Sequence, residues 1–234
     1  MGVFKPDLLK SFTIGFAVGC AGLAALSLSP AHAAERALLA PVPTAAAKES
    51  PGLKVAIFAG GCFWGVEGVF SHTKGVTSAI SGYQGGARGT ARYDQVSGGN
   101  TGHAESVRVT YDPSKVSYDQ LLRVYFSVIV DPTQVDGQGP DTGTQYRSAL
   151  VPLNDAQRAA ATAYLAQLRA SRLWRAPIAT RIEAYKGFFP AEEHHQDFMA
   201  RNPDQPYIVA WDVPRLAAFR RLFPSLYQPA FTRG

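Results

Sequence analysis

Short apolar runs alternate along the chain with stretches in which apolar residues recur every three or four positions. The first kind predicts buried or half-buried β-strands, and the second predicts amphipathic helices. Strands are predicted at residues 54–59, 77–81, 104–111, 149–153 and 179–185. Helices are predicted at residues 63–70, 117–129, 154–172, 190–198 and 213–222. Strands interleaved with helices, without an internal repeat, indicate a single domain of the α/β or α+β class.

Two polar, glycine-rich stretches interrupt this pattern. Residues 82–102 and 131–148 show no sustained period, and loops of this length inside a compact domain are usually functional or disordered. Two helix starts are also marked. Ser117 with Gln120 resembles a capping box, and Asn154 is a favoured N-cap residue. The domain is therefore expected to be loop-rich, and its loops are candidates for function.

Residues 1–33 follow the pattern of a secretory signal peptide. A basic start precedes an apolar stretch at residues 11–29, and Ala31-x-Ala33 fits the small-residue cleavage site. This predicts export, with a periplasmic location. An uncleaved leader anchored in the inner membrane is one alternative, because the apolar length is borderline for spanning a bilayer. Lipidation of Cys20 is the other.

Composition and charge exclude some classes of function. The chain has 234 residues and a net charge of +5. Its Lys and Arg residues are scattered and form no run, which favours a solvated basic surface over a nucleic-acid-binding one. Residues 34–52 are rich in Ala and Pro and are interpreted as a linker. Residues 53–234 are then the folded domain.

Cysteine usage indicates a reactive thiol. Of the two cysteines in the chain, Cys20 leaves with the predicted leader, so Cys62 has no partner for an internal disulfide. Cys62 lies between Gly60-Gly61 and the predicted helix 63–70. A helix N-terminus favours the thiolate, which is the nucleophilic form, and glycines allow a substrate to approach closely. A small buried core cysteine is the competing interpretation.

Glu105 is the first candidate for acid chemistry. By strand alternation it shares a face with Val107, Val109 and Tyr111. Burial among apolar residues raises the pKa of a carboxyl group and keeps it protonated as an acid. A surface glutamate at a frayed strand end is the alternative.

Further candidates lie beside Cys62 and in the two loops. Phe63 and Trp64 follow Cys62 directly and are candidates for an apolar pocket or for core packing. Phenols are good neutral donors to a developing oxyanion. Polar candidates in the loops are Tyr93, Asp141, Gln145 and Tyr146. Adjacent His194 and His195 face apart on a helix, so no metal site is predicted.

Five motifs, taken in order, resemble the peptide methionine sulfoxide reductase A family over residues 54–228. They are GCFWG at 61–65, SGYQGG at 81–86, TGHAESVRVTYDP at 101–113, GTQYRS at 143–148 and FFPAEEHHQDF at 188–198. The resemblance implies a two-layer sandwich around a mixed sheet. It also implies reduction of the S epimer of methionine sulfoxide, free or in oxidised proteins, as repair of oxidative damage.

The same resemblance implies a role for each candidate residue. Cys62 matches the nucleophile that attacks the sulfoxide sulfur and becomes a sulfenic acid, and Glu105 matches the acid that protonates the oxygen. The remaining matches are two phenols that bind the oxygen, the pocket for the substrate methyl group and a residue that orders the site. These are Tyr93 and Tyr146, Phe63 and Trp64, and Asp141.

One departure from the family pattern concerns how Cys62 is reduced again. Many members carry C-terminal resolving cysteines, but residues 199–234 contain none. The resolving thiol is therefore expected to come from outside, from thioredoxin, from glutaredoxin with glutathione, from a periplasmic thiol carrier or from dithiothreitol. No metal or organic cofactor is implied, and a monomer is expected.

Two other classes of function remain open at this point. A sulfoxide- or methionine-binding module that has lost turnover would also lack a resolving cysteine. Another thiol enzyme, such as a peroxidase, would also need a single activated cysteine. Turnover of the sulfoxide with an added thiol distinguishes both from a reductase.

Overall fold

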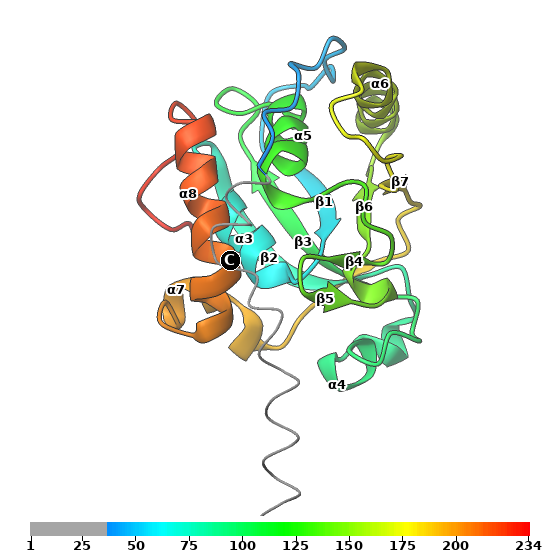
Figure 1. Cartoon of the computed structure of the whole chain (residues 1–234), viewed down its shortest axis with the longest axis vertical. Coiled ribbons are helices and arrows are strands. Elements are labelled where there is room, and N and C mark those ends of the chain that lie inside the picture. The colour runs from blue at the N-terminus through cyan, green and yellow to red at the C-terminus, as the bar shows by residue number, and fades with distance from the viewer. Residues whose placement is uncertain (1–36) are drawn as a thin grey trace, which may run out of the picture.

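A six-stranded mixed sheet, in the order β7-β6-β1-β3-β2-β8, forms the centre of the computed structural model, which describes residues 37–234 (Figure 1). All neighbouring strands pair antiparallel except β6 and β7, which pair parallel. The expected mixed sheet is confirmed. The signal peptide, its cleavage site and Cys20 all fall within residues 1–36, outside the described part of the chain.

The elements have the following bounds. The strands are β1 Lys54–Gly60, β2 Val76–Gln84, β3 Ala104–Tyr111, β4 Gly137–Gln138, β5 Asp141–Thr142, β6 Ser148–Val151, β7 Arg181–Ile182 and β8 Phe188–Pro190. The α-helices are α3 Phe63–Ser71, α4 Tyr93–Val96, α5 Tyr118–Val124, α6 Asp155–Ser171, α7 Phe198–Arg201 and α8 Val213–Leu222. Two π-helices span Tyr125–Ile129 and Ile208–Asp212. Short 3₁₀ turns span Arg88–Thr90, Thr144–Tyr146 and Glu193–His195.

The helices gather on one face of the sheet, and this arrangement makes the predicted two-layer sandwich. Phe58 of β1 and Val107 of β3 belong to the main hydrophobic cluster with residues of α3, α5, α6 and α8. The opposite face carries a much smaller cluster of Ala59, Ala104 and Ala149. The Phe58 ring packs, tilted, against the rings of Phe70 in α3 and of Tyr125, at centroid distances of 4.9 and 5.5 Å. The core therefore lies directly behind the junction of β1 and α3.

Both predicted helix caps are present. The Ser117 side chain accepts from the Gln120 backbone N–H and the Gln120 side chain accepts from the Ser117 N–H, which completes a capping box at α5. The Asn154 side chain accepts from the Gln157 N–H at the start of α6. These local signals fix the helix starts because they satisfy backbone donors that the first turn leaves unpaired.

The first predicted loop, residues 82–102, is shorter than expected. Strand β2 continues to Gln84 and pairs there with β8, and α4 lies within the remainder. Gly82 belongs to the strand because a Cβ there would lie 2.5 Å from the Phe189 carbonyl oxygen and 2.4 Å from the Phe188 ring. The glycine serves close packing of two strands and does not mark a turn.

Two predicted elements after residue 178 are also shorter than expected. The strand predicted at 179–185 is reduced to β7, and the helix predicted at 190–198 is only a 3₁₀ turn followed by the short α7. The Gln196 side-chain amide is engaged with the Ser81 backbone in β2, and Asp197 has a left-handed backbone with φ +51°. Tertiary hydrogen bonds thus break the helical pattern at this point.

The segment interpreted as a linker is attached to the domain over residues 37–52, here called the N-terminal strap. Ala40 is fully buried, and its N–H donates to Ser127 Oγ at 2.9 Å. Further along, Glu49 accepts from the Tyr111 hydroxyl and from the Tyr118 N–H. The strap has no regular secondary structure, which fits its composition, but these contacts make it part of the fold.

The strap is expected to contribute to stability through Glu49. Replacing Glu49 with Ala leaves the Tyr111 hydroxyl and the Tyr118 N–H without their partner, and should lower the free energy of unfolding by about 1–3 kcal/mol. Denaturant unfolding measures this loss. The control is Lys48→Ala at the exposed neighbouring position, which should change stability by less than about 0.5 kcal/mol. Equal effects of the two substitutions would show that the strap bonds contribute nothing.

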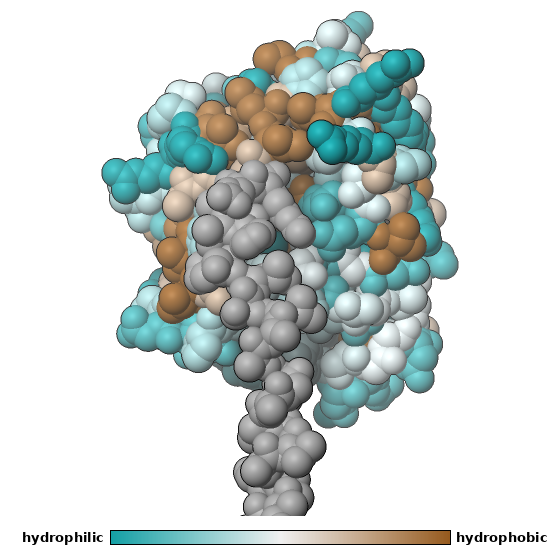
Figure 2. Space-filling model, viewed as in Figure 1, coloured by the Kyte–Doolittle hydropathy of each residue, from teal (hydrophilic) through white to brown (hydrophobic). Residues whose placement is uncertain are grey.

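Exposed apolar side chains gather where the strap crosses the molecule. Apolar colour is concentrated near the upper edge of the face in Figure 2, the edge over which the strap runs in Figure 1. Leu38, Leu39 and Val42 of the strap are among the exposed large hydrophobic residues. In the part of the chain that the structure describes, no helix combines the length and apolarity needed to cross a bilayer.

Candidate active site

Cys62 lies at the junction of β1 and α3, as the N-cap residue of the helix. The turn before it requires glycine. Gly61 has φ +85°, and a Cβ there would lie 2.5 Å from Cβ of Gln138. Within the helix, a Cβ on Gly65 would lie 2.0 Å from a carboxylate oxygen of Asp212. Gly61 and Gly65 therefore let β4 and Asp212 approach the junction of β1 and α3 closely.

Glu105 is buried beside Cys62, with 2% of its surface exposed. Its Oε2 atom accepts a 2.9 Å hydrogen bond from the Phe63 N–H, the first peptide after Cys62. Burial raises the pKa of the Glu105 carboxyl to about 8, with a smaller contribution from the charge of Asp141, while the Phe63 N–H acts in the opposite direction. The carboxyl is therefore protonated at neutral pH, and the predicted burial of Glu105 is confirmed.

The two loop tyrosines face the same space. Burial raises the pKa of Tyr93 and of Tyr146, and the charges of Glu105, Asp141 and Cys62 raise both further. These effects indicate that the five groups lie near one another, because Coulombic interactions fall off with distance. Both phenols stay neutral and can donate hydrogen bonds to an oxygen placed between them.

Trp64 forms the side of the site with residues from the C-terminal third of the chain. Its ring stacks on Phe198 at 3.7 Å and meets Tyr207 edge-on at 5.9 Å. Its Nε1–H donates to Nδ1 of His195 at 3.2 Å, and His195 also lies 5.3 Å from the Phe63 ring. Phe63 and Trp64 thus both belong to the aromatic cluster around His195, although Phe63 is buried and Trp64 is half-buried.

The ionisation of Cys62 differs from the sequence-based expectation. The backbone N–H of Trp64 in the first turn of α3 does lower the thiol pKa, as a helix N-terminus should. The surroundings of the half-buried Cys62 side chain nevertheless raise the thiol pKa well above its ordinary value. Burial is the largest cause, and Glu105, Asp212 and Asp141 add to the effect when they are ionised. In the free protein these effects oppose the helix N-terminus and favour the neutral thiol, which the local sequence argument did not anticipate.

Arg147 joins the loops that carry the site, a role that the sequence did not indicate. Its guanidinium donates to the carbonyl oxygens of Gly102, His103 and Thr144 at 2.8–3.2 Å. It also pairs with Glu183 through two bonds of 2.7 and 3.0 Å. The segment before Glu105 and the turn before Tyr146 are thus held to one planar group.

The loop carrying Tyr93 is held from two further sides. Glu192 accepts from the Tyr93 N–H at 3.0 Å and from the Tyr83 hydroxyl at 2.9 Å. Gln145, a candidate for the site itself, donates its side-chain amide to the Ser97 carbonyl at 3.0 Å. Gln145 therefore joins the loop that carries Tyr93 to the turn that carries Tyr146.

Sequence reasoning missed Tyr207 and Asp212. The Tyr207 hydroxyl donates to Asp141, and the Asp212 carboxylate pairs with Arg215 at 3.2 Å. Burial raises the pKa of Asp212 to about 7, and the charge of Asp141 adds to it, while Arg215 lowers it. No residue spacing in the segment 205–212 marks these side chains, because their place depends on how the C-terminal region folds over α3.

Glu67 of α3 is a second buried acid, and it lies against β2. It is fully buried, its Oε1 accepts from the Ser81 N–H at 3.3 Å, and its Oε2 has no hydrogen-bond partner. Burial, with a contribution from Asp197, raises the pKa of Glu67 to about 8. The folded protein therefore holds a proton that an unfolded chain releases near pH 4.5.

This proton makes stability depend on pH. Because the folded-state pKa of Glu67 is raised, its contribution is fully present below about pH 4.5 and is lost as the pH rises towards 8. Glu67→Gln stays neutral, so its stability relative to wild type should increase by at least about 1 kcal/mol between pH 5 and pH 8. The control is Glu193→Gln, a side chain that is 90% exposed. Parallel unfolding curves for both variants across this range would contradict the assignment.

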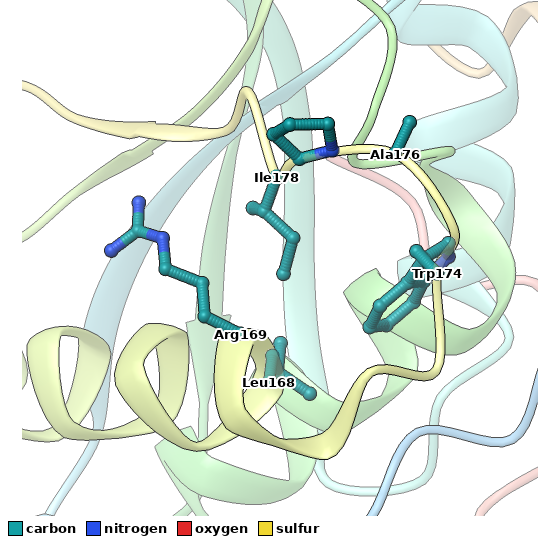
Figure 3. A pocket seen from close by; sticks show the side chains of 6 residues that line it. Leu168, Arg169, Trp174, Ala176 and Ile178 are labelled. Carbon is teal, nitrogen blue, oxygen red and sulfur yellow. The ribbon is translucent and has the colours of Figure 1, made fainter.

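A separate cavity of about 270 Å³ lies beside α6, away from these groups. Figure 3 shows Leu168, Trp174 and Ile178 pointing into it, with Arg169 on the side opposite Trp174. None of the predicted site residues lines it. The cavity is therefore distinct from the space around Cys62.

Comparisons with known proteins agree on one family. Residues 54–225 match the sequence model of the family described as "Peptide methionine sulfoxide reductase". A reductase named MsrA 2 from Mesorhizobium japonicum is 58% identical over 180 residues, which is 77% of this chain and 92% of the relative. A reductase named MsrA from Chromobacterium violaceum is 45% identical over 75% of this chain and 99% of its own length.

Solved structures of similar fold carry related names. The structure described as reduced Mxr1 of Saccharomyces cerevisiae superposes with a TM-score of 0.60 at 35% identity, covering 65% of this chain and 87% of that one. Methionine sulfoxide reductase A of Corynebacterium diphtheriae superposes with a TM-score of 0.56 at 32% identity, covering 72% and 89%.

Proposed function

Because this chain belongs to the peptide methionine sulfoxide reductase A family and reduces methionine sulfoxide to methionine, we propose that Cys62 attacks the sulfoxide sulfur while Glu105 protonates its oxygen. The observation that supports this assignment best is the hydrogen bond between the Glu105 carboxyl and the Phe63 N–H. It places a protonated acid against the peptide that follows the thiol.

The chemical step balances without any further group. The Cys62 sulfur loses two electrons, the sulfoxide sulfur gains two, and one oxygen atom passes between them. Cys62 forms a bond to the sulfoxide sulfur as Glu105 protonates the sulfoxide oxygen. The S–O bond of the substrate and this new S–S bond then break, and the hydroxyl group passes to the Cys62 sulfur. Cys62 becomes a sulfenic acid, and the proton that leaves its thiol restores the Glu105 carboxyl. Methionine is the product.

A protonated Glu105 also helps Cys62 to ionise. The Glu105 charge is among the causes that raise the pKa of the thiol, but that charge is absent when the carboxyl carries its proton below pH 8. The thiolate then faces one negative group fewer. Hydrogen bonds from Tyr93 and Tyr146 to the sulfoxide oxygen make the sulfur more electrophilic, because they stabilise the negative end of the S–O dipole.

The aromatic cluster is the proposed site of the substrate methyl group. Phe63 and Trp64 follow the nucleophile directly and both pack on His195, and a methyl group packs favourably on such rings. With the methyl group held there and the oxygen held by the phenols, only one sulfoxide configuration points its sulfur at Cys62. The S epimer is proposed, with free and peptide-bound methionine sulfoxide as substrates.

An external thiol is the proposed reductant of the sulfenic acid. Cys20 lies in the proposed leader and residues 63–234 contain no cysteine, so the attacking thiol is proposed to come from another molecule. Thioredoxin, glutaredoxin with glutathione and a periplasmic thiol carrier are the proposed physiological donors, and dithiothreitol serves in vitro. The proposed mechanism uses no prosthetic group or metal and is complete within a monomer.

Multiple-turnover kinetics test the function. Purified protein should reduce the S epimer with at least one of these thiols and leave the R epimer unchanged. A protein that releases one methionine per chain and never turns over with any thiol would be a binding module. A protein that consumes peroxide faster than the sulfoxide would be a peroxidase, and either outcome contradicts the proposal.

Export to the periplasm is proposed on the pattern of residues 1–33 alone. Expression of the full chain, followed by cell fractionation and N-terminal sequencing, tests it. A periplasmic protein that begins at residue 34 is expected. A full-length protein in the membrane fraction would support the anchored alternative, and a lipid on Cys20 would support lipidation.

A further inference from the structure

Tyr125 reaches the backbone immediately before Cys62. It is fully buried at the start of the π-helix Tyr125–Ile129, and its hydroxyl donates to the Ala59 carbonyl at 2.6 Å. Ala59 lies three residues before the nucleophile. Burial keeps the phenol neutral by raising its pKa, so it acts as a fixed donor.

The Tyr125–Ala59 bond is made where β1 is no longer paired with β3. Pairing of β1 with β3 ends at Phe58, whereas pairing with β6 continues to Gly60. The last residues before the nucleophile therefore have a strand on one edge only. The Tyr125 hydroxyl supplies a hydrogen bond to β1 in this region.

The two glycines before Cys62 are confined between the π-helix and β4. A Cβ on Gly60 would lie 2.9 Å from Val130, 3.0 Å from Ile129 and 3.3 Å from the Tyr125 ring. On the following residue, Gly61, a Cβ would lie 2.5 Å from Gln138. The backbone leading to Cys62 is thus packed on both sides, and neither glycine has room for a side chain.

These two supports are joined to each other. The Gln138 amide donates to the Asp131 carbonyl at 2.9 Å and accepts from the Asp131 N–H at 2.9 Å, directly after the π-helix. The π-helix closes with a bond from the Val130 N–H to the Tyr125 carbonyl at 3.1 Å. The wider π turn brings Tyr125, Ile129 and Val130 together onto Gly60, a use typical of π-helical turns near functional sites.

We propose that Tyr125 is a positioning residue for the nucleophile: its hydroxyl and ring, with Gln138 opposite, fix the course of Gly60-Gly61 and thereby the direction of the Cys62 thiol. The inference rests on the proposed role of Cys62. A small displacement of the thiol changes its line of attack on the sulfoxide sulfur, and a shift of about 1 Å can cost on the order of 100-fold in rate.

Tyr125→Phe keeps the ring and removes the hydroxyl, and with it the bond to Ala59. Tyr164→Phe is the matched control. Tyr164 is also a buried tyrosine, but its hydroxyl donates at 2.7 Å to the carbonyl of Pro41, which lies in the strap and not beside Cys62. Single-turnover reduction of the S sulfoxide without reductant measures the saturating rate and the half-saturating concentration. Tyr125→Phe should lower the saturating rate about 10-fold, with the half-saturating concentration within about twofold of wild type.

Tyr164→Phe should leave both kinetic values within about twofold of wild type. Both variants lose a buried hydroxyl, so their thermal stabilities should fall by similar amounts. Equal saturating rates for the two variants would overturn the proposal. Inactivity of the wild type would instead contradict the proposed function, so the two failures are distinguishable.

Gly60→Ala gives a second test that does not depend on the hydroxyl. The added methyl group would press on Val130 and Ile129 at the end of the π-helix. It should also lower the saturating rate without changing the half-saturating concentration. The loss in the Tyr125→Phe/Gly60→Ala double variant should be smaller than the product of the single losses, because the two changes displace the same backbone. Fully multiplicative losses would show that the sites act independently and would overturn the proposal.

Discussion

Replacing Cys62 with serine is expected to lower the rate of methionine sulfoxide reduction by at least about 10⁴-fold, because a hydroxyl in place of the thiol cannot accept the oxygen at a useful rate. The fold should be unchanged, since the site already holds a protonated, neutral sulfur. Reduction of the S sulfoxide with excess dithiothreitol measures the loss, and circular dichroism checks the fold.

The control for this variant is Ser114→Ala, a similarly small change at an exposed residue that takes no part in the proposed step. Its activity should equal that of the wild type, because the proposed step uses Cys62 alone. Residual activity in Cys62→Ser that exceeds a few per cent of wild type would show that another group carries out the reduction.

Replacing Glu105 with glutamine should lower the single-turnover rate by about 10²–10⁴-fold, because an amide cannot supply the proton that the departing oxygen needs. The variant should also lose a limb of the pH profile. In the wild type the proton on Glu105 is present below its pKa of about 8 and is lost above it, so the rate should fall as the pH rises through 8.

In Glu105→Gln that alkaline fall should be absent, and the rate should instead rise with pH as the Cys62 thiol ionises. Glu193→Gln, at an exposed side chain, should keep the wild-type profile. An alkaline limb that persists unchanged in Glu105→Gln would assign the acid to a different group.

The positions of Cys62 and Glu105 could be predicted from local patterns. Gly60-Gly61 at the end of β1 indicated that Cys62 lies at a helix N-terminus, and strand alternation placed Glu105 among apolar residues. Both inferences depend only on neighbours in the sequence, as do the caps at Ser117 and Asn154. Such patterns are strong because a strand or helix fixes which residues share a face.

The protonation state of the thiol could not be predicted in this way. The helix N-terminus acts on Cys62 as expected, but Asp141 and Asp212 approach from distant parts of the chain and raise its pKa together with burial. Their approach depends on glycines at 61 and 65 that allow close packing. Burial and charges from distant parts of the chain thus oppose the effect of the helix N-terminus on the thiol pKa.

The loops showed the same limit. Gly82 was interpreted as part of a loop, although it lies in β2 and its small size serves the contact with β8. Arg147 reaches the His103 carbonyl across 44 residues of sequence, and the strap residue Ala40 reaches Ser127 across 87. Nothing in the spacing of these residues marks the partners that tertiary folding brings to them.

The central claim is that Cys62 itself takes the oxygen atom from the sulfoxide. The most direct test mixes reduced protein with excess S sulfoxide in the absence of any thiol and measures both products by mass spectrometry. The account predicts one methionine per chain and one added oxygen on the peptide that contains Cys62, with further turnover only after dithiothreitol is added. Methionine formed without oxygen on Cys62, or repeated turnover without a thiol, would contradict it.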